Sequence, residues 1–90
     1  MDLVVETAAT EVIVRLSGEI DVADTPALKE RLRAAMETGL PVRVDGTGVT
    51  FLGSSGLTVF LELRRLGPLT LDRGNERIDR LLALTGGSRP

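Results

Sequence analysis

The stretch "EVIVRLS", residues 11–17, decides the fold. Val12, Val14 and Leu16 fall on one face of an extended chain and the intervening residues on the other, a period of two that is typical of a half-buried strand. The run "DLVVE" precedes it and is joined to it by the short connection "TAAT". A β-hairpin is therefore expected over residues 3–17.

A helix is predicted after the hairpin, in "TPALKERLRAAMETGLP". Thr25 is expected to be its N-cap, and Pro26 suits the first helical turn. Apolar side chains recur on one face with helical spacing. Gly39 and Pro41 are expected to end the helix.

The rest of the chain alternates strands and helices. Further strands are expected at residues 42–45 and 69–72, and further helices at 54–66 and 75–85. The order β-β-α-β-α-β-α predicts an α/β fold, a mixed β-sheet of about four strands with about three helices packed on it. One domain is expected over residues 1–87, followed by a loose C-terminal tail at 88–90.

The composition excludes several classes of function. The chain has no histidine and no cysteine, so it lacks the commonest general base, nearly every zinc site and all thiol chemistry. The net charge of -2 does not attract the phosphate backbone of a nucleic acid, and without tyrosine or tryptophan there is little on which bases could stack. "MDLVVE" is acidic where a secretory signal is basic, and no apolar run is long enough for a membrane span. We expect a cytoplasmic protein that is not an enzyme and has no cofactor or metal.

The adjacent serines in "FLGSSGL", residues 51–57, allow three interpretations. Gly48 and Gly53 have the glycine spacing of a phosphate-binding loop, but Ser54 replaces the lysine that should follow. A serine nucleophile is disfavoured because "GSSG" misses the G-x-S-x-G elbow and no histidine takes the proton. Ser54 is best explained as the N-cap of the next helix. Ser55 then lies in the first turn, where the positive end of the helix favours a phosphate. Such a phosphate would add its negative charge to any surface that docks there.

Two longer stretches, "LSGEIDVADTPALKERL" and "VDGTGVTFLGSSGLTVFLEL", carry a family resemblance. Together they resemble the STAS domain, named for sulfate transporters and anti-sigma factor antagonists, and in particular the small stand-alone antagonists of bacterial partner switching. The resemblance runs from about residue 3 to Thr85. Its most specific parts are residues 18–21, 45–51 and 54–57. It implies the STAS fold.

The resemblance also implies a regulatory cycle centred on Ser55. In such proteins the second serine of the pair is phosphorylated by an ATP-dependent serine kinase that is also the anti-sigma factor, and a serine phosphatase reverses the reaction. The unmodified form binds the anti-sigma factor and frees the sigma factor, whereas the phosphorylated form is released. The protein is then a substrate and a binding module.

Two acids match recurrent positions of the family. Asp21 lies near the phosphoacceptor in relatives, and either orients the serine hydroxyl or caps the next helix. Asp45 is expected to accept N–H groups of the turn around Gly46 and Thr47. The docking surface is expected to include the loop from residue 50 to 55 and the start of the second helix, where Leu57 also has a core role. The expected partner-binding residues are Asp21, Asp24, Gly53, Ser54, Ser55, Gly56, Leu57 and Thr58.

Two departures from the family keep other functions open. Gly53 stands where relatives usually have an aspartate, which removes a charge and frees the backbone. This favours an alternative, a constitutive STAS subunit of a transporter ATPase or other assembly without phosphorylation. Binding of a small anion or nucleotide at the second helix's N-terminus is a third hypothesis. Many relatives also carry a further terminal helix, so the sheet is either less covered or filled by another chain, as in a homodimer.

Overall fold

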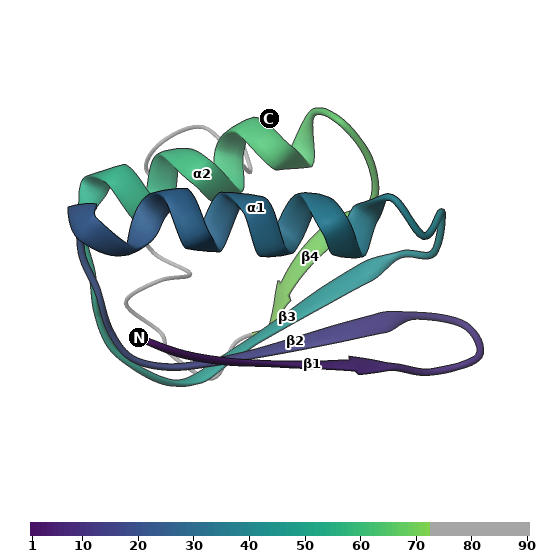
Figure 1. The fold of residues 1–90 in the computed structure, drawn as a ribbon, viewed down its shortest axis with the longest axis horizontal. Coiled ribbons are helices and arrows are strands. Elements are labelled where there is room, and N and C mark those ends of the chain that lie inside the picture. Colours follow the sequence, from purple (N-terminus) through teal and green to yellow (C-terminus); the bar gives the residue numbers. More distant parts are fainter. Residues whose placement is uncertain (73–90) are drawn as a thin grey trace, which may run out of the picture.

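The structure, a computed structural model, describes residues 1–72 and places two α-helices over one face of a four-stranded sheet (Figure 1). The elements in chain order are β1 (Asp2–Thr7), β2 (Val12–Ile20), the 3-10 helix η1 (Val22–Asp24), α1 (Thr25–Met36), β3 (Val42–Leu52), α2 (Ser54–Arg64) and β4 (Leu69–Asp72). The helix expected over residues 75–85 and the tail at 88–90 lie outside the described residues.

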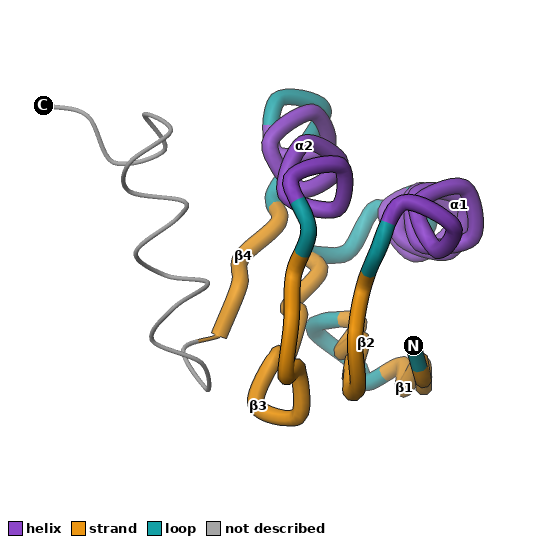
Figure 2. The backbone as a smooth tube through the Cα atoms, turned by 90° about the vertical axis from the view of Figure 1, so that its left-hand side faces the viewer, coloured by secondary structure: helices purple, strands orange, loops and turns teal. Residues whose placement is uncertain are grey.

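The sheet is mixed, as the element order predicted. Its strands lie in the order β1-β2-β3-β4, with β1 antiparallel to β2 and the other two pairs parallel. The predicted hairpin is confirmed, because Thr7 pairs with Val12 and the Ala8 N–H donates to the Glu11 carbonyl oxygen at 2.8 Å. The two parallel pairs are connected through α1 and α2, and both helices lie on the same side of the sheet (Figure 2). No helix of residues 1–72 is long and apolar enough to cross a membrane.

The core lies between this helical layer and the sheet. Val12, Val14 and Leu16 are buried, which confirms the alternation seen in the sequence. Burial of such aliphatic side chains contributes roughly 1.5–3 kcal/mol each. The other fully buried large side chains in this core are Ile20, Leu28, Leu32, Val42, Val44 and Leu63. The strands and both helices therefore share a single core.

The start of α1 differs from the prediction. Asp24, not Thr25, is the N-cap residue, and its side chain makes no capping bond to α1. The reason is that η1 leads directly into α1, so Thr25 is already helical and its Oγ1 donates to the Val22 carbonyl oxygen at 2.9 Å. Pro26 lies in the first turn, as expected.

Strand β3 is longer than the predicted segment 42–45. It continues to Leu52 because its second half pairs in parallel with the end of β2, where Ile20 lies opposite Leu52. Gly48 permits this pairing, since a Cβ atom there would lie 2.8 Å from the Cβ of Ser17. The extended pair carries the chain to the edge of the sheet where η1 and α2 begin.

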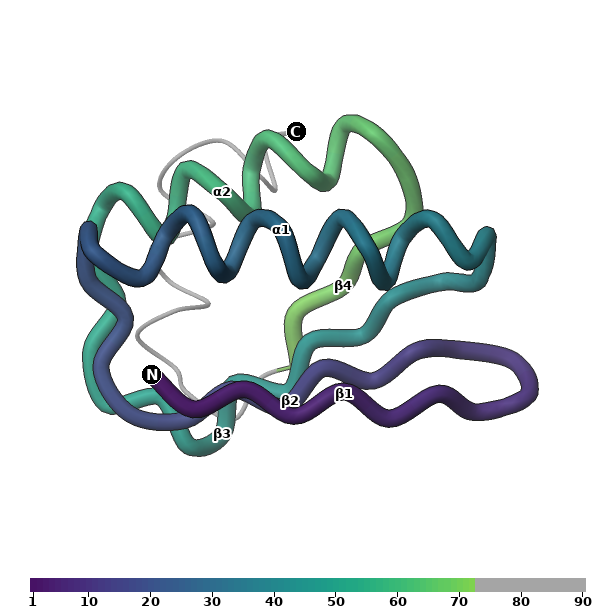
Figure 3. The backbone as a smooth tube through the Cα atoms, in the orientation of Figure 1, coloured from purple at the N-terminus to yellow at the C-terminus, as the bar shows by residue number. Residues whose placement is uncertain are grey.

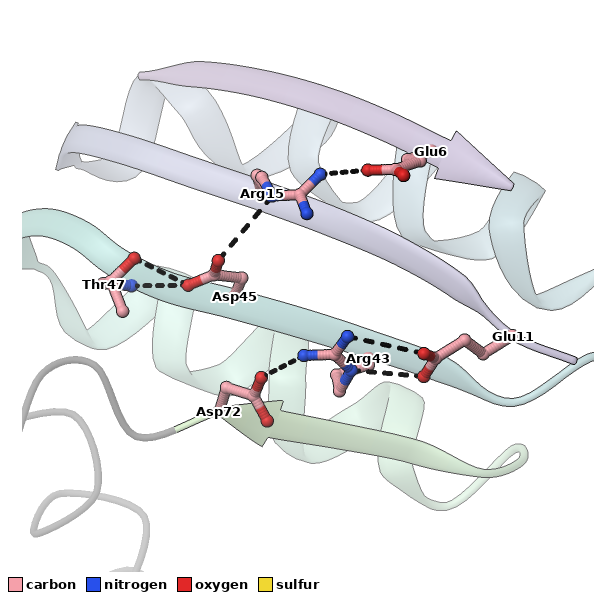
Figure 4. Close-up of polar contacts among 7 residues, drawn as sticks. All are labelled: Glu6, Glu11, Arg15, Arg43, Asp45, Thr47 and Asp72. Carbon is pink, nitrogen blue, oxygen red and sulfur yellow. Dashed lines mark hydrogen bonds and ion pairs between the residues drawn. The ribbon is translucent and has the colours of Figure 1, made fainter. Parts of the chain in front are cut away.

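The face of the sheet opposite the helices carries ion pairs (Figure 4). Arg43 lies between Glu11 and Asp72, with Nε–Oε1 and Nη1–Oδ2 distances of 3.1 Å and 2.5 Å, and both carboxylates raise the pKa of the guanidinium. Arg15 pairs with Glu6 and lowers the pKa of that carboxyl through a hydrogen bond and its charge. Together with the pair between Arg15 Nε and Asp45 Oδ2 at 3.8 Å, these ion pairs link β1 to β2, β2 to β3 and β3 to β4.

Asp45 accepts the N–H of Thr47, as expected, but the predicted turn around Gly46 and Thr47 is instead an irregular part of strand β3. Its Oδ1 accepts the backbone N–H of Thr47 at 3.0 Å and the Thr47 hydroxyl at 2.7 Å. The two hydrogen bonds from Thr47, followed by the charges of Arg15 and Arg43, lower the pKa of Asp45 below its ordinary value of 3.8. Because the folded pKa is lowered, Asp45 stabilises the fold above that ordinary value, and the contribution is lost as the pH falls through the folded pKa.

Replacing the Thr47 hydroxyl tests this arrangement. We expect Thr47→Val to raise the pKa of Asp45 toward 3.8, because the hydroxyl bond is the largest cause of the shift. The measurement is a carboxyl-carbon NMR titration, together with urea unfolding across the acid range, where the difference in stability between the two proteins should shrink as the pH falls. Thr50→Val, on the same strand and equally exposed, is the control. Equal pKa values for Asp45 in all three proteins would contradict the assignment.

Candidate functional site

The candidate site lies at the end of the molecule where β2 and β3 terminate. Ile20 pairs with Leu52 at the ends of these strands, and the Gly53 N–H donates to the Ile20 carbonyl oxygen at 2.9 Å. Helices α1 and α2 both begin at this end, at the left of Figure 3. The fold thereby brings residues 20–25 next to residues 51–58, the two segments that the sequence singled out.

Gly56 fixes the position of α2 on the strand ends. It is buried, and a Cβ atom there would lie 2.8 Å from Leu52 Cδ1 and 3.1 Å from Ile20 Cγ2. The next residue, Leu57, is 7% exposed and belongs to the core, so its predicted core role is confirmed. Gly56 and Leu57 therefore hold the helix in place, and the surface available to a partner comes from their neighbours.

The prediction that Ser54 caps α2 is wrong. The N-cap is Gly53, with φ -74 and ψ 164, and it provides no side-chain cap. The ladder of β2 and β3 continues to the Gly53 N–H, so the chain turns into the helix at Gly53, one residue earlier than predicted. Ser54 is exposed in the first turn, where its carbonyl oxygen accepts the Thr58 hydroxyl at 3.0 Å.

Ser55 occupies the second position of α2 and is half-buried. Its hydroxyl makes no hydrogen bond to any other residue of the described range 1–72. The first helical bond runs from the Leu57 N–H to the Gly53 carbonyl oxygen at 3.1 Å, so the N–H groups before it have no helical acceptor. The site therefore offers a free hydroxyl beside unpaired donors and the positive end of a helix.

The two predicted acids accept backbone N–H groups of the connection around η1, and within residues 1–72 they do not bond to Ser55. Oδ1 of Asp21 accepts the Ala23 N–H at 3.0 Å, and Oδ2 of Asp24 accepts the Asp21 N–H at 3.0 Å, which forms a capping box around η1. Of the two roles open to Asp21, the cap is confirmed. Within the described residues neither acid hydrogen-bonds to Ser55. Asp21 nevertheless lies close to the turn, because its Cα is 3.8 Å from the position of a Cβ on Gly53.

Two exposed apolar side chains also lie at this end. Phe51 is 44% exposed and its Cε2 lies 3.7 Å from a Cβ placed on Gly53, while Val22 in η1 is 72% exposed. Phe51 falls within the loop 50–55 that was predicted to be part of the docking surface. Val22 was not among the residues predicted for this surface. The signal for Val22 was an isolated apolar residue in a short acidic connection. Exposed apolar side chains beside polar ones are typical of protein-binding surfaces.

Other ligands find less support at this site. The segment between Gly48 and Gly53 is strand β3 rather than a loop, which removes the phosphate-binding interpretation. In residues 1–72 no group of three or more acidic side chains is arranged to hold a metal ion. The features that gather here are a free hydroxyl, two carboxylates and two apolar side chains, an arrangement suited to binding a protein.

Gly53 leaves α2 without a side-chain cap, and Gly53→Asp tests this. The backbone is already extended, the nearest atom to a new Cβ is the Ile20 oxygen at 3.5 Å, and the carboxylate would accept the N–H of Ser55 or Gly56. We expect a stability gain of about 0.5–1 kcal/mol in urea unfolding. Gly53→Ala is the control, since it restricts the unfolded chain without adding an acceptor. The prediction fails if the aspartate variant is no more stable than the alanine variant.

The close packing of Gly56 predicts a loss of stability on adding one methyl group. We expect Gly56→Ala to destabilise the fold by about 1–3 kcal/mol, because Leu52 or α2 must move to accept the Cβ. The matched control is Ser54→Ala, an exposed position in the same turn, for which little change is expected. Thermal and urea unfolding compare the three proteins. Equal stability of the two variants would show that α2 adjusts without cost.

Comparisons with known proteins agree with this geometry. The family model described as Mlab, STAS domain, matches residues 3–88. The anti-sigma-B factor antagonist of Bacillus subtilis (strain 168) is 35% identical over 81 residues, which cover 84% of this chain and 74% of that protein.

Two solved structures share the fold. An anti-sigma factor antagonist from Mycobacterium paratuberculosis has a TM-score of 0.78 and 27% identity, covering 98% of this chain and 82% of that one. The antagonist SpoIIAA in its unphosphorylated form has a TM-score of 0.77, covering 94% and 81%, and at 17% identity it supports the fold alone. The chain belongs to the STAS domain family, and the relatives that it resembles within this family are anti-sigma factor antagonists.

Proposed function

We propose that this chain is an anti-sigma factor antagonist whose partner docks at the start of α2 and is released when Ser55 is phosphorylated. The family and the named antagonists among its relatives support the antagonist role. The observation that carries the switch is that Ser55 is half-buried and its hydroxyl makes no hydrogen bond within residues 1–72. A cytoplasmic location, an anti-sigma factor with serine kinase activity and a serine phosphatase are parts of this proposal.

The proposed docking surface combines apolar and charged groups. It includes the hydroxyl of Ser55 and the exposed side chains of Phe51 and Val22, which belong to segments that lie at the same end of the molecule. Apolar groups of this size supply binding energy when a partner removes them from water. Asp21 and Asp24 are exposed or half-buried beside them and add negative charge at the rim. A partner with an apolar patch and basic groups around it matches this surface.

The modification itself is chemistry of the partner. The Ser55 oxygen forms a bond to the γ-phosphorus of ATP, the bond to ADP breaks, and the hydroxyl proton passes to a base of the kinase. The phosphatase returns serine and inorganic phosphate by adding water. Within residues 1–72 no side chain hydrogen-bonds to the Ser55 hydroxyl as a base would, which supports the proposal that the base belongs to the kinase. In this proposal the chain is the substrate of the kinase.

Phosphorylation releases the partner through charge. A phosphoserine carries about -1.5 to -2 charges at neutral pH, and at a docking surface that charge must be desolvated and meets the existing acids. The fold itself tolerates the anion, since the helix end and its unpaired N–H groups favour it. Gly53 contributes here, because an aspartate at that position would compete for the same N–H groups. The partner is lost while the structure persists.

Gly53 also favours one alternative, a STAS subunit that stays bound to a larger assembly such as a transporter ATPase. Such a subunit has no need of the carboxylate next to the serines. In that case the end of the molecule with Ser55 is a permanent interface and the serine is part of a helix start. The two functions differ in whether charge at position 55 changes binding.

Charge at position 55 is the direct test. We expect a kinase-like anti-sigma factor from the native cytosol to be captured by the wild type and by Ser55→Ala but lost by Ser55→Asp, because the carboxylate imitates part of the phosphate charge. Thr10→Asp, an exposed position in the connection before β2 and so at the opposite end of that strand from the site, is the matched control and should retain the partner. Partners are identified by mass spectrometry, and their affinities are then measured with purified proteins. If Ser55→Asp holds the same partner as tightly as the wild type, the switch is wrong and the constitutive subunit is supported.

A further inference from the structure

A groove runs between the two helices from the site toward the middle of the molecule. Helices α1 and α2 lie side by side with their N-termini at the same end (Figures 1 and 2). Thr25, Pro26 and Lys29 of α1 line the groove together with Ser55, Val59 and Glu62 of α2. The modifiable hydroxyl and a lysine of the neighbouring helix therefore share one hollow of the surface.

Lys29 is held only weakly in the unmodified protein. Its Nζ lies 3.7 Å from Oε1 of Glu62, and the two side chains are 44% and 55% exposed. Exposed ion pairs of this kind contribute about 0–1 kcal/mol. Within residues 1–72 Lys29 makes no hydrogen bond, so a stronger anion in the groove would displace Glu62 at little cost.

The geometry of the helices directs Lys29 toward Ser55. Ser55, Val59 and Glu62 are spaced by four and three residues and so lie on one face of α2, with Lys29 opposite them. Side chains on a helix tilt toward its N-terminus, which for α1 is the end that holds Ser55. Ser55 and Glu62 are about two turns apart along α2; rotation of the four-carbon lysine stem moves the ammonium group by about one turn, roughly 5.4 Å, and the phosphate extends from Ser55 toward it.

We propose that Lys29 is the intramolecular counter-ion of a phosphate on Ser55, and that it exchanges Glu62 for this phosphate when the serine is modified. The inference rests on the modification in the proposed function. A phosphate dianion attracts an ammonium group more strongly than a carboxylate does. The exchange holds the phosphate against α1 and leaves Glu62 as an additional free negative charge. Modification then alters the surface at two points, the start of α2 and the middle of the helix pair.

The other charged groups around the phosphate are acids. Asp21 and Asp24 lie on the connection between β2 and α1, and Glu62 lies two turns along α2. All three raise the pKa of a nearby phosphate, whereas Lys29 lowers it. Of the residues that line the groove with Ser55, Lys29 is the cation. Arg33 lies one turn further along α1 and borders a different hollow, without Ser55, which makes it a matched comparison.

The test measures the second pKa of the phosphate directly. Protein with phosphoserine incorporated at position 55 during synthesis is titrated by phosphorus NMR across the range around pH 6, where this group ionises. We expect Lys29→Gln to raise the pKa by about 0.2–0.7, the shift equivalent to one exposed ion pair. Lys29→Arg should leave it near the wild-type value. Arg33→Gln, which removes the same charge from the same helix, should change it much less.

The outcomes separate this inference from the proposed function. A larger shift for Lys29→Gln than for Arg33→Gln, with rescue by arginine, supports a direct pair. Equal shifts for the two glutamine variants overturn it, because they would reflect only the net charge. The titration needs neither kinase nor anti-sigma factor, so a failed binding experiment leaves it valid, and a failed titration leaves the proposed function standing. Lys29 is exposed, and an amide spectrum of each variant confirms that it is folded.

Discussion

The close approach of Gly56 to the ends of β2 and β3 is the constraint on which the site depends. With Ile20 and Leu52 within 3.1 Å of where a side chain would begin, α2 starts immediately above the strand ends. That position places Ser55 one residue before the contact, half-buried and without a hydrogen-bonding partner in the described range. Packing in the core therefore sets the position of the hydroxyl, and the proposed docking surface rests on the rigid ends of the sheet strands.

The charge distribution follows from the topology. Two parallel crossovers bring the N-termini of α1 and α2 to the same end, so two positive helix ends lie together. The carboxylates of Asp21 and Asp24 are used in capping η1 and keep this end from being strongly positive. In the proposed function, a phosphate on Ser55 would meet favourable helix ends within the molecule and unfavourable carboxylates at the rim. The fold would then tolerate the anion, whereas a partner that covers the rim would be repelled.

Patterns of the sequence predicted the fold well and individual contacts less well. The alternation of Val12, Val14 and Leu16 identified the central strand, because a half-buried strand needs one apolar face. The hydrogen bonding of Asp45 could be predicted from local chemistry, because its carboxylate accepts from Thr47, only two residues further along the chain. The cap of α2 was misplaced because it depends on pairing between Gly53 and Ile20, which are far apart in the chain. The place of Val22 at the site and the groove beside Lys29 likewise depend on segments that come together only in the folded chain.

The packing of Gly56 also determines what a modifying enzyme has to recognise. Ser55 lies in the first turn of α2, which is held in place by the burial of Leu57 and by contact with the strand ends. An isolated peptide as short as α2 would not keep this helical shape. Protein kinases that bind their substrates as extended strands would find no such strand here. If Ser55 is phosphorylated as proposed, its kinase must recognise the folded surface, and unfolded or truncated copies would escape modification.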